Sequence, residues 1–508
     1  MNTITSLNRA SPANASPATA TSARASATSG TGSAGGASTV VSLGSAPAAG
    51  PTFVWENRTR STAATMMAQN FGNEPVSGRL KGLGGELLRQ VAYDGQDFSQ
   101  SIQRGPDGVQ ADTYDMLVSP SQVSQHGMGD NQVALTITTR SGVKVQLSLD
   151  AGGNSVAIKA ESSGDLNEAE RKALGKLSDA FQKAIDGLTR EPPRIDLGGL
   201  TQFDQGALAS VDLKGSIKLN PKETQTLAFH ADAKERTVSF SGPAGSAKIG
   251  VDLPQPAAWG GKEQQAKALD RYLQQVDQAG LRGQAGGAML GMFKDAFTDM
   301  NSDYGMPAVA PSPSLLMTER DRALTTGLAD FTASVALPDV ASNPARPMEK
   351  DSFSYELSQT TRMSGQSAWD LSVSQQQQSR LKASYHMPAK AGATLALDLS
   401  PTSQNYKYVT IDDAASSSTS FKYDQGVLAK ATHDMQASRS TRVLEVMFGK
   451  VRDDHTTPAG KASSRDLLPA LKDDALPADA WERAQALAAV NDSIFLQSDP
   501  DAIAGDPA

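Results

Sequence analysis

Cysteine is absent from the 508 residues of this chain. Its absence excludes a disulfide framework, a thiolate zinc site, an iron–sulfur cluster and a cysteine nucleophile. It does not identify the compartment in which the protein works.

Aromatic residues and long apolar runs are also scarce. Phe, Trp and Tyr make up 5% of the chain, which contains 44 glycines and 26 prolines, so we expect a sizeable fraction to lie outside a packed core. No run of 18 apolar residues is present that could span a bilayer as a helix. The length still allows two or three folded units of about 100 to 200 residues each.

Positive charge is in the minority, with 47 Lys and Arg against 55 Asp and Glu and a net charge of -8. A whole-protein attraction to nucleic acid or to anionic lipid is therefore not expected.

The first fifty residues contain no acidic side chain, and Arg9 and Arg24 are their only charged residues. Ser, Thr, Ala, Gly, Pro and Asn dominate this leader, which cannot bury enough apolar surface to offset its ordering entropy. We therefore predict that residues 1–50 are disordered. No apolar stretch of the usual length follows a basic start, which argues against a Sec-type signal peptide.

Three interpretations of the leader are open. It is a flexible tail, an uncleaved export signal or an organelle transit peptide, although it lacks the amphipathic Arg-bearing helix of the last class. In composition the leader resembles the export signals of bacterial type III or flagellar-type secretion. The resemblance covers about a tenth of the chain and implies no functional residue.

Residues 51–304 are predicted to form an α+β domain. Alternating apolar residues at 133–140 and 143–149 predict a β-hairpin, and 155–161 a third strand. An apolar stripe over 165–188, with Asp165 and Glu168 as a capping box, predicts a helix that covers the sheet. Further strands are expected at 211–219, 225–231, 237–241 and 247–253, and helices at 86–92, 262–280 and 284–300.

A second unit is predicted after a Pro-rich linker region at 305–350, which includes a short helix. Strand patterns from 353 to 448, with small-residue turns, predict an antiparallel β domain at 351–460 that closes into a sandwich- or barrel-like sheet. Expected strands lie at 353–362, 368–374, 381–386, 394–399, 406–411, 418–423 and 441–448, while 427–437 is ambiguous. Residues 461–508 are expected to be an acidic tail with an amphipathic helix near 478–491.

No motif for nucleotide, metal or nucleophile chemistry is found, so we assign no catalytic residue, no cofactor and no metal ligand. Two histidines lie beside carboxylates, in the pairs His433 with Asp434 and Asp454 with His455. Such neighbours could build an acid/base or metal site if folding brought them together. Adjacent residues on a strand point to opposite faces, so Asp454 and His455 would need a turn to act jointly.

The helix after residue 280 carries glycines at helical spacing and a soft apolar surface. The candidate partner-binding residues are Gly283, Gly287, Gly291, Met289, Met292 and Phe293. In one interpretation the glycines let another helix approach while the Met and Phe side chains enter the core. In the other, the same side chains form an exposed groove for a partner.

The leading hypothesis is a non-enzymatic binding or structural protein, exported by a non-Sec route or associated with a bacterial cell surface or secretion apparatus. We expect its partner to be a protein, with no nucleic acid and no stable membrane insertion. A cytoplasmic location is the alternative to export. Two other functions are open: a hydrolase that uses an Asp/Glu pair or a His–Asp site, and an intracellular adaptor that binds through the Gly/Met helix.

Deletion of residues 2–50 tests the export interpretation. We expect the full-length chain in the medium or envelope of its own host, and the shortened chain in the cytosol, because the leader would carry the export signal. Cell fractionation and immunoblotting measure the distribution. Equal retention of both chains in the cytosol would reduce the leader to a tail.

Overall fold

The computed structural model describes residues 53–57, 61–73, 75–104, 124–305 and 317–503. The predicted disordered leader lies outside the described residues. By contacts, the chain divides into Met1–Ala48 and Ala49–Ala508, and everything below concerns the second unit.

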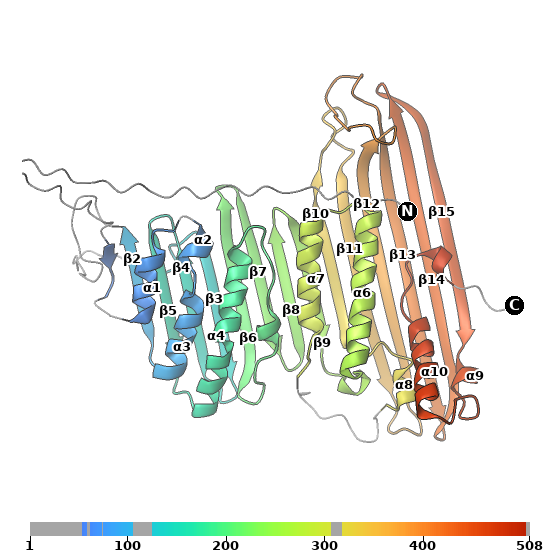
Figure 1. Cartoon of the computed structure of the whole chain (residues 1–508), viewed down its shortest axis with the longest axis horizontal. Helices are drawn as coiled ribbons and strands as arrows, with labels where there is room; N and C mark the ends of the chain where they lie inside the picture. Colours follow the sequence, from blue (N-terminus) through green and yellow to red (C-terminus); the bar gives the residue numbers. More distant parts are fainter. Residues whose placement is uncertain (1–52, 58–60, 74, 105–123, 306–316, 504–508) are drawn as a thin grey trace, which may run out of the picture. The chain divides into compact units, whose positions relative to one another are not determined.

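The described residues contain one antiparallel sheet of 15 strands (Figure 1), in the order β1-β2-β5-β4-β3-β6 and then consecutively to β15. The first nine strands are β1 (Phe53–Trp55), β2 (Phe98–Arg104), β3 (Asn131–Thr139), β4 (Lys144–Ala151), β5 (Ser155–Ser162), β6 (Leu208–Asn220), β7 (Glu223–Asp232), β8 (Glu235–Gly242) and β9 (Gly245–Asp252). The others are β10 (Asp330–Val340), β11 (Asp351–Ser364), β12 (Ser372–Pro388), β13 (Tyr406–Asp424), β14 (Val427–Met447) and β15 (Lys450–Asp466). From β7 onward each strand therefore pairs with its neighbours in sequence.

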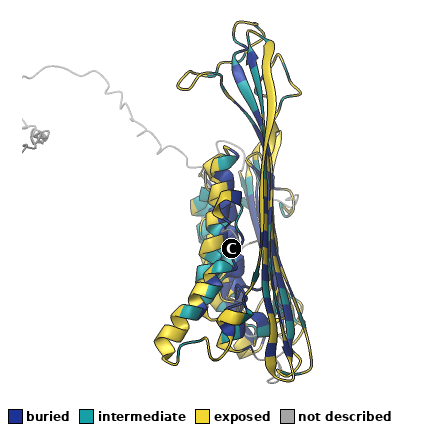
Figure 2. Cartoon of the chain, turned by 90° about the vertical axis from the view of Figure 1, so that its right-hand side faces the viewer, coloured by how far each residue is buried: buried dark blue, intermediate teal, exposed yellow. Residues whose placement is uncertain are grey.

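The main helices cover one face of this sheet, and buried residues concentrate between the two layers (Figure 2). The helices are α1 (Thr62–Asn70), α2 (Val76–Arg79), α3 (Leu83–Asp94), α4 (Glu168–Thr189), α5 (Gly198–Thr201), α6 (Lys262–Arg282), α7 (Gly287–Asn301), α8 (Glu319–Arg322), α9 (Leu468–Leu471) and α10 (Ala480–Ser493), with short 3-10 turns η1 (Pro256–Ala258) and η3 (Pro500–Ala502). The predicted α+β class, an antiparallel sheet with covering helices, is confirmed.

The helix layer forms where the sequence has an apolar stripe. Along α4, Leu174, Phe181 and Ile185 are buried, and the helix begins with a capping box made by Asn167 and Glu170. This box lies two residues beyond the predicted one. Further along the sheet, Tyr272 of α6 and Phe297 of α7 pack edge-to-face on Phe331 of β10, with ring centroids 4.9 and 5.0 Å away.

A second, sandwich- or barrel-like unit is not present in the described residues, because strands β10 to β15 continue the first sheet. The link is β10, which pairs with β9 on one side and with β11 on the other. This strand lies inside the predicted linker region at 305–350. The prolines of this region predict a break, but Pro338 lies near the end of the strand and leaves its paired part intact.

The strands after β10 are longer than predicted. Of the expected strand at 368–374 only residues 372–374 are in β12, which also contains 381–386, and residues 368–371 form the turn before it. The expected strands at 406–411 and 418–423 are parts of β13, and the ambiguous segment 427–437 is part of β14. The expected strand at 394–399 is a loop, and 461–466 belong to β15 instead of the tail. The Ser-, Gln- and Ala-rich stretches between the predicted pieces are strand interiors. Alternate side chains lie on the face without helices, and the others, such as Gln377 and Ser417, are buried on the helix side.

Arg236 on β8 joins the sheet to the helix layer. Its side chain is buried, with 1% exposed, and donates to the carbonyl oxygens of Met300 at 3.1 Å and Ser302 at 2.8 Å. The other terminal nitrogen donates to Thr201 at 3.2 Å and Asp303 at 2.7 Å. The guanidinium thus caps the end of α7, and burial lowers the pKa of Arg236 to about 10.

Replacement of Arg236 by Met should lower the free energy of unfolding by about 3 kcal/mol, because four carbonyl groups lose a charged donor. The matched control is Arg271→Met, which removes an exposed ion pair with Asp492 and should cost less than about 1 kcal/mol. Urea denaturation of both variants measures the difference. Equal stability of the two would contradict the capping role.

Candidate functional site

No described element covers the sheet face opposite the helices from β6 to β14, and this uncovered face carries short polar side chains in register. One row across neighbouring strands consists of Asp212, His230, Thr237, Gly250, Thr332, Ser358, Gln378, Ser416 and Gln436. Strand alternation places these residues outward, since their neighbours in sequence point into the core. The face is therefore a regular array of hydroxyl and amide groups.

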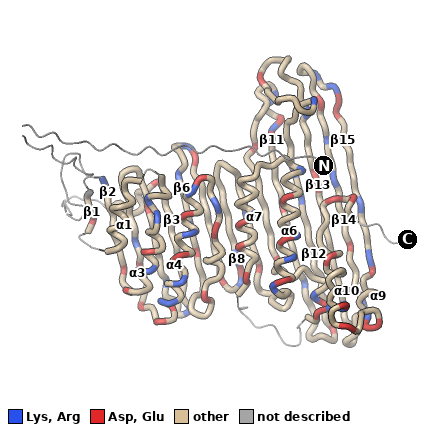
Figure 3. Tube along the Cα trace, in the orientation of Figure 1, with Lys and Arg blue, Asp and Glu red and all other residues tan. Residues whose placement is uncertain are grey.

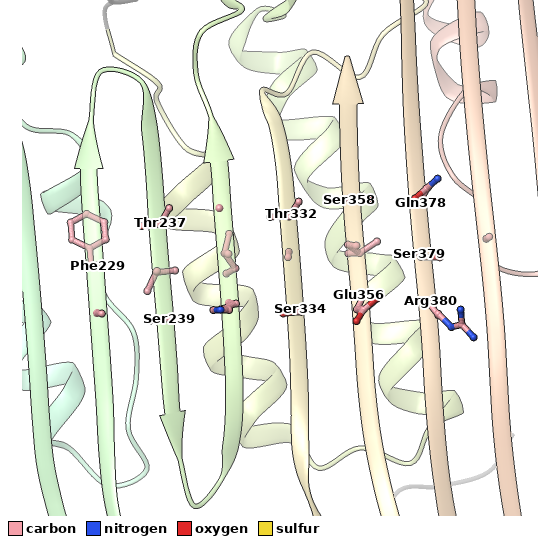
Figure 4. Close-up of a pocket in the computed structure, with 18 of the residues that line it drawn as sticks. Phe229, Thr237, Ser239, Thr332, Ser334, Glu356, Ser358, Gln378, Ser379 and Arg380 are labelled. Atoms are coloured by element: carbon pink, nitrogen blue, oxygen red, sulfur yellow. The ribbon is translucent and has the colours of Figure 1, made fainter. Parts of the chain in front are cut away.

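A hollow of about 980 Å³ lies on this face (Figure 4). Its floor is low because the outward side chains are small, as at Ser239, Ser334 and Ser358, and Gly250 has no side chain. Longer side chains also line the hollow, including Glu356 and Arg380, which lie opposite each other on β11 and β12. Core residues such as Phe229 and Val238 also line the hollow, although their side chains are buried. The shape is thus a shallow depression across many strands.

The charges around the hollow are only partly neutralised. A terminal nitrogen of Arg380 lies 3.2 Å from both carboxylate oxygens of Asp412. Lys214, Lys248 and Glu356 make no ion pair with any of the described residues. These exposed groups are available to a partner, and two of the three are cationic.

One histidine–carboxylate pair lies in the hollow. Nδ1 of His230 is 2.7 Å from Oδ1 of Asp212, while Nε2 is 3.8 Å from Asp232. The shorter contact orients the ring, and Nε2 can exchange a proton with a bound hydroxyl group. Thr237 lies opposite His230 on the next strand, but no hydrogen bond joins the two side chains in the described structure. The pair therefore has part of an acid/base arrangement.

The histidine pairs that the sequence singles out do not form joint sites. His433 is buried, with Nε2 3.0 Å from Oγ of Ser417, and Asp434 lies on the opposite face, where it accepts from Ser464. Burial lowers the pKa of His433 to about 4, so it is neutral near pH 7.

The second pair is divided in the same way, as strand alternation predicts. Nδ1 of His455 contacts Asp453 at 2.7 Å, whereas Asp454 accepts two hydrogen bonds from Arg442 at 2.7 and 2.8 Å. His455 is exposed and no described pocket contains it.

The Gly/Met helix is α7 with the end of α6. Met289, Met292 and Phe293 are at most 2% exposed, which favours the core interpretation over partner contact. Gly283 caps α6, where a Cβ atom would lie 2.6 Å from the ring of Phe353. Gly287 and Gly291 have no atom within 4 Å of such a position, so they do not mediate a close helix contact among the described residues.

A buried cluster around His386 has no counterpart in the sequence predictions. Nδ1 of His386 is 2.6 Å from Asp351, Nε2 is 3.3 Å from Glu349, and Tyr406 donates to Glu349 at 2.6 Å. The residues come from three strands and a loop, so no linear spacing could reveal them. The cluster attaches the loop before β11 to β12 and β13, and the His386 side chain is inaccessible to solvent.

A second hollow of about 550 Å³ lies between α4 and α7. Burial raises the pKa of Asp299 there to about 6, and nearby Asp196 and Asp295 act in the same direction. The carboxylate of Asp299 also accepts from the backbone N–H of Leu197 at 2.7 Å. Asp299 of α7 therefore has a structural role, because it holds the segment before α5 against α7.

Among the described residues, no group of three or more His, Asp or Glu side chains is arranged to hold a metal ion. None of the helices in the described part of the chain combines the length and apolar character needed to cross a membrane. Comparison with protein-family models, curated proteins and solved structures finds no match for this chain. Its function is therefore inferred from its own residues.

The pKa of His433 predicts a pH-dependent contribution to stability. The imidazole ordinarily titrates near 6.5 and in the fold near 4, so unfolding takes up a proton between these values. The contribution of His433 to the free energy of unfolding has its full value above about pH 6.5. It falls by about 3 kcal/mol as the pH drops to 4. His433→Gln should remove that component, measured by urea denaturation from pH 4 to 7. If the free energy of unfolding depended on pH in the same way in the variant and the wild type, this role of His433 would be contradicted.

Proposed function

We propose that this chain is a non-enzymatic binding or structural protein whose working surface is the uncovered face of β6 to β14. The observation that carries the proposal is the in-register array of short polar side chains over nine strands, which no helix among the described residues covers. A face of this kind is broad and shallow. A small ligand would stay largely exposed on it, whereas ligand pockets usually enclose most of their ligand.

A protein partner fits the chemistry of the face. Hydroxyl and amide groups recur about every 4.8 Å from strand to strand, so an extended segment or a second sheet can hydrogen-bond to several at once. Small residues such as Ser334 and Ser358 allow close approach of the partner's backbone. Lys214 and Lys248 favour a partner that carries acidic side chains opposite them.

The mixture of polar groups and unpaired charges is typical of an interface that forms and separates, in contrast to the apolar interfaces of permanent assemblies. We further propose that the protein works outside the cytosol or at a secretion apparatus, because of the acid-free leader. The leader deletion described above tests that part by itself.

Substitution of Ser334 or Ser358 by Arg tests the face. Both side chains point away from the core, so an arginine fills the hollow and should weaken partner binding at least about tenfold, at little cost in stability. Gln274→Arg on the exposed side of α6 is the matched control. A photo-crosslinking residue at position 358 in the host captures the partner, and titration with the purified partner measures affinity.

The expected result is crosslinking at position 358 but not at position 274, and lower affinity only for the variants on the sheet face. Equal crosslinking at the two positions, or unchanged affinity in Ser334→Arg and Ser358→Arg with intact thermal melting, would overturn the proposal.

A further inference from the structure

The outer edge of β15 is long and exposed. β15 has 17 residues, is the last strand of the sheet and pairs only with β14 among the described elements. Nearly all its side chains are exposed on both faces. The opposite edge strand, β1, has only three residues.

The backbone hydrogen bonds show which groups of β15 face outward. The N–H of Leu467 donates to the carbonyl of Ala431 at 2.8 Å, one step beyond the registered pair Thr432 and Asp466. Because hydrogen-bonded and non-hydrogen-bonded pairs alternate in an antiparallel ladder, odd-numbered residues from 453 to 467 bond to β14. Even-numbered residues from 454 to 466 therefore turn their N–H and C=O groups to the free edge.

Pro458 has an even number, so the N–H group that it lacks would have faced outward. This explains how proline lies inside a 17-residue strand without breaking the ladder to β14. The other even-numbered positions keep their outward N–H groups. The edge thus retains most of the groups that a further strand would need.

We propose that two copies of this chain pair along β15, antiparallel and about a two-fold axis at Ala459. In this register Asp453 of each copy lies opposite Arg465 of the other, and Pro458 lies opposite Gly460. The even-numbered residues form the hydrogen-bonded pairs, as the outward groups require, and Ala459 faces its own copy in a non-hydrogen-bonded pair. Only the missing N–H of Pro458 leaves a gap in the ladder.

Neighbouring registers are less favourable. A register centred on Pro458 opposes two prolines and loses both hydrogen bonds of the central pair. One centred on Gly460 opposes Asp454 to Asp466, which places like charges together, and one centred on Lys461 opposes two lysines. The register at Ala459 creates two pairs of opposite charge. A register centred on Thr457 also opposes Asp453 to Lys461, but it pairs only residues 453–461 of the regular strand, whereas the register at Ala459 pairs residues 453–465.

The charges of β15 have both signs (Figure 3), with Asp453 near its start and Arg465 near its end. Charges and proline on an edge strand usually discourage pairing with other chains. In β15 the positions of the charges and of Pro458 favour the register centred on Ala459 over the neighbouring registers. The assembly stops at two copies, since each copy uses its only long free edge among the described strands.

This inference goes beyond the proposed function, because a dimer would form whether or not the uncovered face binds a partner. A two-fold axis perpendicular to the sheet would place both uncovered faces on the same side.

Charge exchange tests the pairing in the full-length chain. We expect sedimentation to show a reversible species of twice 53.1 kDa. Asp453→Arg and Arg465→Asp should each raise the dimer dissociation constant about tenfold, because two attractive pairs become repulsive, and the double variant should restore it. The control is Arg380→Asp, a charge change away from the edge that should leave the constant unchanged.

A single introduced cysteine tests the register, since the chain has none of its own. In the proposed pairing the two Cα atoms at position 459 lie about 4.5 Å apart, so Ala459→Cys should form an intermolecular disulfide under mild oxidation with diamide. Thr457→Cys, on the same face, is the control. Its two copies would lie about 13 Å apart along the strands and should not crosslink.

A monomer at all concentrations would overturn the proposal, and so would a dimer insensitive to both single charge changes. Crosslinking through position 457 but not 459 would overturn the register. Thermal melting of each variant separates loss of pairing from loss of folding, and partner crosslinking at position 358 reports independently on the proposed function.

Discussion

Burial on one side only is the constraint on which this structure depends. Each central strand places alternate residues under the helices and the others in water, as the burial pattern of β3 shows. Burial of apolar area, at about 25 cal/mol per Å², fixes which residues face the helices. A slip of one residue would exchange the two faces of a strand, so the same constraint fixes the register across the sheet.

The covered face is not wholly apolar, because the chain's last segment crosses it without regular backbone bonding. Gln377 donates to the carbonyl of Ile494 at 2.9 Å, and Gln275 of α6 donates to that of Leu496 at 2.9 Å. The hydroxyl of Tyr272 lies 3.0 Å from Gln359 and 3.2 Å from Gln377. Glutamines on the buried side of β11 and β12 therefore satisfy backbone groups that would otherwise be unpaired beneath the helices.

The uncovered face and the free edge have a common origin in this single-layered sheet. Because no described element covers its other face, the outward positions must be compatible with water, which explains their serine, threonine and glutamine content. Because the described strands do not close into a barrel, the outer edge of β15 pairs with no other described strand. Both surfaces are polar, and each carries exposed hydrogen-bonding groups. A pair of chains joined at β15 would present one face twice as wide.

The sequence by itself determined the elements whose apolar residues repeat regularly: the strands β3 to β9, the helices α4, α6, α7 and α10, and with them the α+β class. It also indicated that Asp454 and His455 point apart, because alternation along a strand is local. Only the tertiary structure decided that β10 joins two predicted units, that Gln375 and Gln377 are buried, and that Asp212 meets His230 or His386 meets Asp351. These outcomes depend on which strands become neighbours. The residue pattern of one segment does not show which distant segment it will pair with, because pairing produces no periodicity in the sequence of either segment. Polar strand interiors such as that of β13 resemble turns in isolation, and only hydrogen bonding to β12 and β14 makes them strands.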